Sequence, residues 1–114
     1  MIAWTGLDEV EVFNIIFSNA CKVNATQIMI SSDNRGASIY FSSADDLQTF
    51  EHLPTKYVPP LLRYIKNMSG IDQYKEPPLE GVTVITSEER EFTLTVRIAK
   101  GSVGEEIEIS FFEM

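Results

Sequence analysis

The one concentration of basic residues in this sequence consists of Lys56, Arg63 and Lys66. The chain has nine Lys and Arg against seventeen Asp and Glu, which gives a net charge of −8. Arg63 and Lys66 are three residues apart, a spacing that lets two side chains share one helix face. Tyr57 and Tyr64 lie beside them and can supply the apolar anchor that affinity requires. Lys56, Tyr57, Arg63, Tyr64 and Lys66 are therefore predicted to bind an acidic protein partner; the alternative is a solvated outer helix face.

Other residues of chemical interest occur singly. Cys21 and His52 are the only cysteine and the only histidine. Cys21 is expected to be a small buried hydrophobe, and His52 a surface or capping residue with no nucleophile beside it. Asp45 and Asp46 are interpreted as acidic residues at the start of a helix and not as metal ligands, because no third ligand follows at a suitable spacing.

No motif of catalysis or cofactor binding is present in the sequence. Gly101 and Gly104 are not followed by the Lys and the Ser or Thr of a phosphate-binding loop. The glutamates at 88, 89 and 91 and at 105, 106 and 108 are interpreted as solvated turns and wet strand faces. We therefore predict no catalytic residues, no metal, no cofactor and no enzymatic activity.

Composition narrows the classes of protein further. A chain of 114 residues with 44% apolar content fits one domain, which we assign to residues 1–114. Its net negative charge repels nucleic acid and anionic membrane surfaces. No apolar run approaches the ~20 residues that span a bilayer, and the start lacks a signal peptide pattern. We expect a cytoplasmic protein without nucleic-acid binding or membrane insertion.

The basic group belongs to the best-defined helix, within Leu53 to Asp72. Its apolar positions recur at steps of three and four; they are Val58, Leu61, Leu62, Ile65 and Met68. This spacing is typical of one buried helix face, so Leu62 and Ile65 are expected to be buried beneath the sheet. Pro59 and Pro60 suit the first turn, and Gly70 suits the end.

A first helix is predicted to run to about Val23. Thr5 or Asp8 can cap its start, and apolar residues follow helical spacing between Val10 and Cys21. Trp4, just before this helix, is either a lid on the core or an exposed ring that faces a partner.

The remaining apolar segments alternate as strands. Ala25 to Ser32 and Ala37 to Phe41 flank a polar turn that ends in Gly36, which predicts a hairpin. Residues 42–50 are read as a polar cap and a short turn, and residues 73–81 as an irregular connector. Val82 and Val84, then residues 92–98 and 107–111, alternate with polar residues and predict a three-stranded meander with one wet face. The predicted class is α+β, with two main helices on a mainly antiparallel sheet of about five strands.

In this order of elements, the chain resembles the domain that precedes the motor core in type II secretion and type IV pilus assembly ATPases. The similarity runs from about Val10 to Phe111. Five motifs of the family have similar segments in this chain. The motif A-S-D-I-H-I-E-P is similar to Val23 to Ser32, and the motif L-P to Leu53-Pro54. The motif R-I-K-x-M-A-x-L-D is similar to Tyr64 to Asp72, R-P-Q-D-G-R to Pro77 to Val82, and R-V-S…G-E to Arg97 to Ala99 with Gly104 to Glu106.

The chain departs from this family at its polar positions. The Asp, His and Glu of the first motif fall on Gln27, Met29 and Ser31. In the family, arginines of this domain help bind nucleotide held by the motor core. Arg97 is retained, but the arginine after the glycine falls on Val82. The resemblance therefore implies the fold and a docking role beside a motor, without the family's nucleotide contacts.

Three functions remain open from the sequence. The leading hypothesis is a non-catalytic docking or regulatory module whose partner is a secretion or pilus ATPase motor or assembly component. The second is a small-molecule-sensing domain, which rests on analogy of fold alone. The third is an acidic binding or inhibitor protein that uses its charge to engage a basic partner.

Overall fold

The computed structural model describes residues 2–44 and 46–114. These residues form two α-helices, a short 3-10 helix and a six-stranded antiparallel sheet in the order β3-β2-β1-β6-β5-β4. The elements along the chain are α1 (Glu9–Lys22), β1 (Gln27–Asp33), β2 (Gly36–Ser43), β3 (Asp46–Pro54), η1 (Thr55–Tyr57), α2 (Val58–Met68), β4 (Leu79–Ser87), β5 (Arg90–Lys100) and β6 (Glu105–Glu113).

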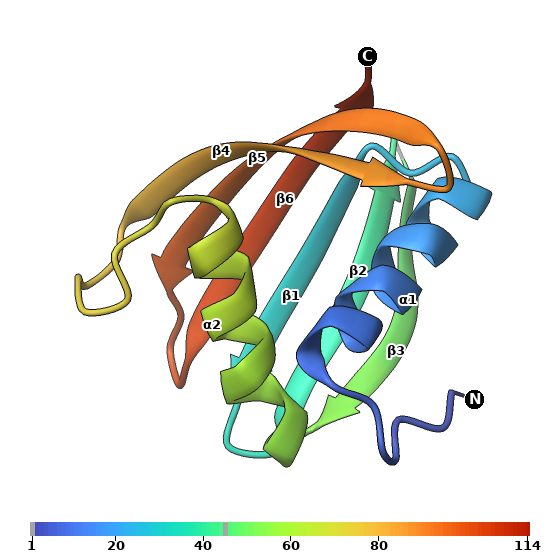
Figure 1. The fold of residues 1–114 in the computed structure, drawn as a ribbon. Coiled ribbons are helices and arrows are strands. Elements are labelled where there is room, and N and C mark those ends of the chain that lie inside the picture. Colours follow the sequence, from blue (N-terminus) through green and yellow to red (C-terminus); the bar gives the residue numbers. More distant parts are fainter. Residues whose placement is uncertain (1, 45) are drawn as a thin grey trace.

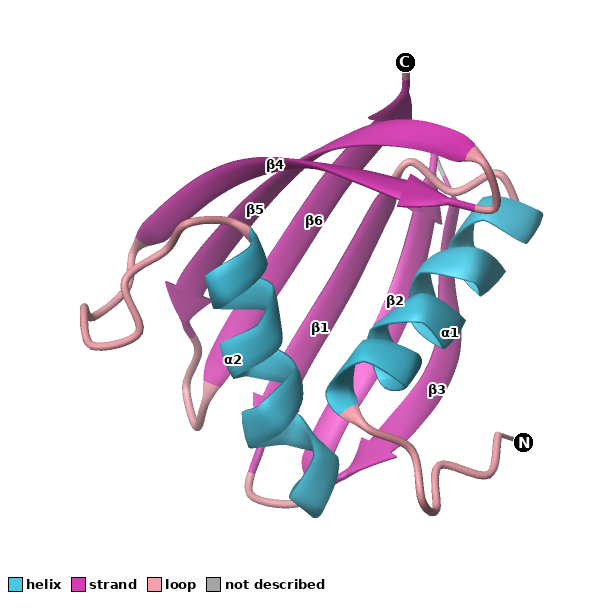
Figure 2. Ribbon diagram, in the orientation of Figure 1, coloured by secondary structure: helices cyan, strands magenta, loops and turns pink. Residues whose placement is uncertain are grey.

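Both helices lie against the same face of the curved sheet (Figure 1). The chain makes one helix and three strands, then a second helix and three strands, and the pairing of β1 with β6 joins the two halves. Figure 2 shows the helices in cyan on one side of the magenta strands and no helix on the other. The α+β class is confirmed, and so are the hairpin and the meander.

The first helix begins where the sequence predicted one of two caps. The Asp8 carboxylate accepts a hydrogen bond from the Glu11 N–H at 2.8 Å, and the Glu11 carboxylate accepts one from the Asp8 N–H at 3.1 Å. This reciprocal capping box satisfies two N–H groups that the helix itself cannot. Asp8 is therefore the cap, and Thr5 is not.

The second helix is also as predicted, with one correction. Ile65 is fully buried, but Leu62 is only half-buried and lies at the border of the apolar face. The helix ends at Met68; Ser69 Oγ donates to the Ile65 carbonyl at 2.7 Å, and Gly70 follows with φ +70°. A left-handed residue just after the last turn is the usual helix stop.

The core lies between the two helices and the sheet. Phe17 of α1 is at its centre, with its ring centroid 5.0 Å from that of Phe92 and 4.9 Å from that of Phe111. Phe13 makes an edge contact with Tyr64 of α2 at 5.6 Å, which links the two helices. Trp4 is 5% exposed and covers one end of the core, so the lid interpretation is confirmed.

The edge strand β3 is absent from the elements predicted from the sequence. Asp46, expected to start a helix, begins this edge strand, and its companion Asp45 lies outside the described residues. The inward-facing Phe50 and Leu53 are three residues apart because a register shift opposite Ile39 and Tyr40 inserts an extra residue. A bulge of this kind breaks the two-residue alternation by which a strand is recognised. The sheet therefore has six strands and not five.

Candidate functional site

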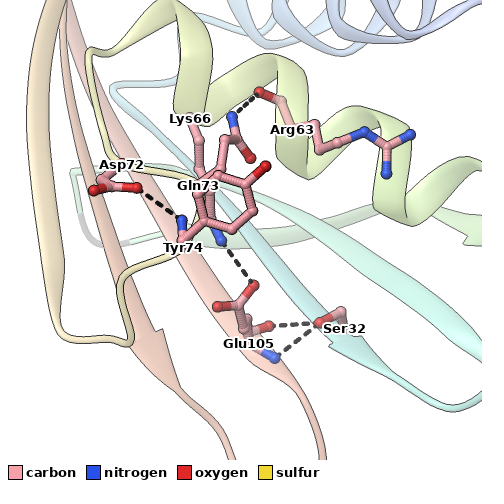
Figure 3. A network of polar contacts seen from close by, with 7 residues as sticks. All are labelled: Ser32, Arg63, Lys66, Asp72, Gln73, Tyr74 and Glu105. Carbon is pink, nitrogen blue, oxygen red and sulfur yellow. Dashed lines mark hydrogen bonds and ion pairs between the residues drawn. The ribbon is translucent and has the colours of Figure 1, made fainter.

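The predicted partner-binding residues do not form one surface. Lys56 lies on η1 with its ammonium 5.2 Å from the centre of the Tyr57 ring. Tyr64 is half-buried against α1. Arg63 is exposed, whereas Lys66 is 8% exposed. Figure 3 shows the Arg63 side chain directed away from that of Lys66, so the two cations do not share a helix face.

Lys66 instead reaches from α2 toward the start of β6. Its ammonium lies 3.7 Å from a carboxylate oxygen of Glu105, whose side chain is 26% exposed (Figure 3). Glu105 is therefore not the solvated strand residue that the sequence suggested. Ser32 fixes the backbone of Glu105, since its hydroxyl accepts from the Glu105 N–H at 2.9 Å and donates to the Glu105 carbonyl at 2.8 Å. This network connects α2, β1 and β6.

The connector between α2 and β4 lies beside this network. The Gln73 amide donates to the Arg63 carbonyl at 3.0 Å and to Asn67 Oδ1 at 2.7 Å. The Tyr74 N–H donates to the Asp72 carboxylate at 2.9 Å. These bonds hold the connector against the end of α2, so it closes one side of a hollow of about 380 Å³.

The hollow gathers a large share of the few cations in this acidic chain. Lys66, Lys75 and Lys100 line it, together with Glu76 and Glu105. Three ammonium groups against two carboxylates make its local charge +1, while the whole chain carries −8. The sequence analysis did not identify this hollow because its lysines come from three separate elements.

A second candidate is the face of the sheet that carries no helix, here called the open sheet face. Residues directly opposite one another on neighbouring strands point to the same side of the sheet. The strand pairing therefore shows which residues lie in one row across this face. Its three central rows are Glu80-Arg97-Glu108-Met29-Tyr40-Thr49, Val82-Thr95-Ser110-Gln27-Ser42-Leu47, and Val84-Thr93-Phe112.

The open sheet face combines exposed apolar side chains with acidic ones. Leu47, Val82, Val84 and Phe112 are each more than half exposed, at 59%, 59%, 54% and 62%. A groove of about 490 Å³ lies beside Leu47, and its lining also includes Met29, Tyr40, Arg97 and Glu108. Val82, Val84 and Phe112 lie toward the β4 edge of this face, whereas Leu47 lies on the opposite edge strand, β3. Exposed apolar side chains that lie close together mark interaction surfaces more often than single ones do.

Val82 and Val84 correct the reading of the meander. The sequence analysis placed them on the core side of a strand with one wet face, but they point away from the helices. Ile85 and Leu79 of the same strand pack against the core instead. The signal in the sequence was the presence of apolar residues at both odd and even positions of this segment, which indicates a strand with apolar residues on both faces.

Arg97, the residue that the resemblance aligns with a family arginine, lies on the open sheet face. Its Nε donates to Glu80 at 3.3 Å, and Glu108 is its cross-strand neighbour on β6. The Arg97 side chain is 63% exposed. Val82, which the resemblance aligns with a second arginine, is two residues beyond Glu80, the β4 partner of Arg97, and offers no charge to a phosphate.

The remaining candidates carry no assembled chemistry. Cys21 is half-buried, and burial raises the pKa of its thiol, although the nearby Arg90 charge acts in the opposite direction. A raised pKa disfavours the reactive thiolate. His52 is exposed, as predicted. Within the described residues, no three His, Cys, Asp or Glu side chains gather as a metal site would require, and no helix has the length and apolar character needed to cross a membrane.

Comparison with known proteins adds no assignment. No model of a known protein family matches the chain, and no curated protein is significantly similar to it.

Proposed function

We propose that the chain is a non-catalytic docking or regulatory domain, related to the domain that precedes the motor core in secretion and pilus assembly ATPases. The observation that carries this proposal is the open sheet face. Both helices cover one side of the sheet (Figure 2), while the other side exposes Leu47, Val82, Val84 and Phe112. A face of this composition buries apolar area only when a partner covers it.

Charge indicates the chemistry of that partner. Among the described residues, the open sheet face carries Glu80, Glu91, Glu106 and Glu108 against the one guanidinium of Arg97. Complementary potentials speed encounter and disfavour wrong partners. The partner is therefore a protein surface with an apolar centre and a basic rim, and not a nucleic acid or an anionic membrane.

The cellular location and the partner that we propose follow from the family that the chain resembles. A domain of this kind acts in the cytoplasm beside a secretion or pilus motor, and its partner is a motor subunit or an assembly component. The resemblance was drawn from the order helix, hairpin, helix and three-stranded meander, and the observed order contains these elements with the edge strand β3 in addition. The predicted group on the α2 side is a second candidate surface, reduced to Lys56, Tyr57 and Arg63, because Tyr64 packs against α1 and Lys66 faces Glu105.

Nucleotide handling gives the first prediction. The sequence has no phosphate-binding loop, and Val82 replaces a family arginine. We expect no measurable ATP hydrolysis and no ATP binding of micromolar affinity or tighter, because the sequence has neither a phosphate-binding loop nor a second arginine to act with Arg97 on a nucleotide. Isothermal calorimetry and a phosphate-release assay test this, and micromolar binding would contradict it.

The second prediction concerns the open sheet face. A double variant, Val82→Lys with Val84→Lys, places two positive charges where a basic partner must dock. We expect loss of specific capture of that partner from the native cell, with little change in thermal stability, because both side chains are exposed. Capture with quantitative mass spectrometry and a thermal melt measure the two effects.

A matched control replaces Lys56 and Arg63 with Glu on the α2 side. Lys66 is left unchanged because a glutamate there would face Glu105 and destabilise the fold. The proposal holds if the partner is lost with the valine variant and kept with the control. Loss with the control alone would transfer the docking role to the predicted α2 surface, and equal capture by all three proteins would refute docking at either place.

The second candidate function is small-molecule sensing. The observation that favours it is the lysine-lined hollow between α2, the connector and the β5–β6 turn, which lies on the helix side of the sheet. This hollow is polar, so its ligand would be charged.

A further inference from the structure

The hollow at the end of α2 has donors for an anion that the chain itself does not satisfy. Lys66 is 8% exposed, and among the described residues its ammonium forms one ion pair, with Glu105 at 3.7 Å, which is beyond hydrogen-bonding distance. No described residue accepts a hydrogen bond from it. The Lys66 Nζ atom is open to solvent in the hollow, so its three donors are available to a ligand.

Two further ammonium groups enter the hollow from different elements. Lys75 comes from the connector and Lys100 from the end of β5, and both side chains line the same space. Neither forms an ion pair with another described residue. The three lysines therefore line one hollow, and among the described residues only Lys66 forms an ion pair, with Glu105.

The β5–β6 turn adds backbone donors in a fixed position. The Gly101 N–H donates to the Gly104 carbonyl at 2.6 Å, which closes the turn. A Cβ on Gly104 would lie 2.4 Å from the Ser32 carbonyl oxygen, so the turn can approach β1 this closely only with glycine. The N–H groups of Ser102 and Val103 donate to no described residue. Consecutive free amides in a turn are typical of anion-binding concavities.

We propose that this hollow binds an oxyanion, a phosphate or carboxylate group of a small molecule, held by Lys66, Lys75 and Lys100 with the amides of the β5–β6 turn. Glu105 offsets part of the Lys66 charge and so sets a weak, reversible affinity. The site lies on the helix side of the sheet, away from the open sheet face. The proposal rests on the second candidate function, small-molecule sensing, and is independent of docking at the open sheet face, so failure of either leaves the other intact.

The test is a titration of the full ¹⁵N-labelled chain with sodium phosphate and, separately, sodium acetate, with sodium chloride holding ionic strength constant. We expect saturable shifts of the amides from Gly101 to Glu105, with a Kd on the order of 1–10 mM. A response to phosphate alone identifies a phosphate-bearing ligand, and a response to acetate identifies a carboxylate; either supports the site. Shifts that grow linearly with any salt would overturn it.

Variants separate binding from a structural role of the lysine. Lys66→Met should weaken binding about tenfold or more, because a charge-assisted hydrogen bond is lost. Glu105→Gln should strengthen binding severalfold, since a competing carboxylate is removed, whereas a purely structural ion pair predicts no gain. Lys75→Ala and Lys100→Ala should each weaken binding without affecting the fold. Lys56→Ala, outside the hollow, is the matched control, and a loss equal to that of Lys75→Ala would refute the site.

Discussion

Replacing Gly36 with alanine should destabilise the protein by about 2–6 kcal/mol. Gly36 has φ +128°, which L side chains rarely adopt, and strain of this kind costs ~1–3 kcal/mol. A Cβ there would also lie 2.1 Å from the Leu53 carbonyl oxygen, so β2 and β3 would have to separate, at an overpacking cost of ~1–3 kcal/mol. Denaturant unfolding followed by circular dichroism measures the difference.

Gly70→Ala is the matched control for that prediction. Gly70 also has a positive φ, +70°, but a Cβ there would meet nothing within 4 Å. Its loss should be limited to about 1–2 kcal/mol of backbone strain. Equal destabilisation by the two variants would mean that the close approach of β3 to Gly36 adds nothing to the loss of stability caused by Gly36→Ala.

The second large effect is expected at Ile65. Ile65→Ala should lower the free energy of unfolding by roughly 2–5 kcal/mol, because the side chain is fully buried and its removal leaves a cavity under α2. Chemical denaturation with an unchanged m-value would show that the loss is one of stability and not of compactness.

Leu62→Ala on the same helix provides the comparison. Leu62 is half-buried, so less apolar area is lost and the vacated space opens to solvent. Its effect should be clearly smaller than that of Ile65→Ala. An unchanged midpoint for Ile65→Ala, or a larger loss for Leu62→Ala, would mean that the helix presents a different face to the sheet.

The local elements with strong signals were predicted from the sequence. Asp8 and Glu11 allow a capping box, and the helix they start ends at Lys22, close to the expected Val23. The turn before Gly36 produced the predicted hairpin. Such signals act within a few residues, and the structure satisfies them with local hydrogen bonds.

Both candidate sites depended on contacts that no local pattern reveals. Lys66 and Arg63 have the spacing of a shared helix face, but the packing of α2 turns Lys66 toward Glu105, 39 positions further along the chain. Val82 and Val84 alternate as core residues do, yet the register with β5 turns them to the open sheet face. Spacing alone cannot state which side of an element meets the rest of the fold.

The sequence by itself determined the acidic charge, the two helices with their ends, and the strand character of the hairpin and the meander, because these follow from composition and from interactions between near neighbours. Only the tertiary structure decided the pairing of β1 with β6, the bulged edge strand β3, the lysine hollow and the side of the sheet left uncovered. Each of these depends on segments that are distant in sequence, and their contacts form only when both helices bury their apolar faces on the same side of the sheet.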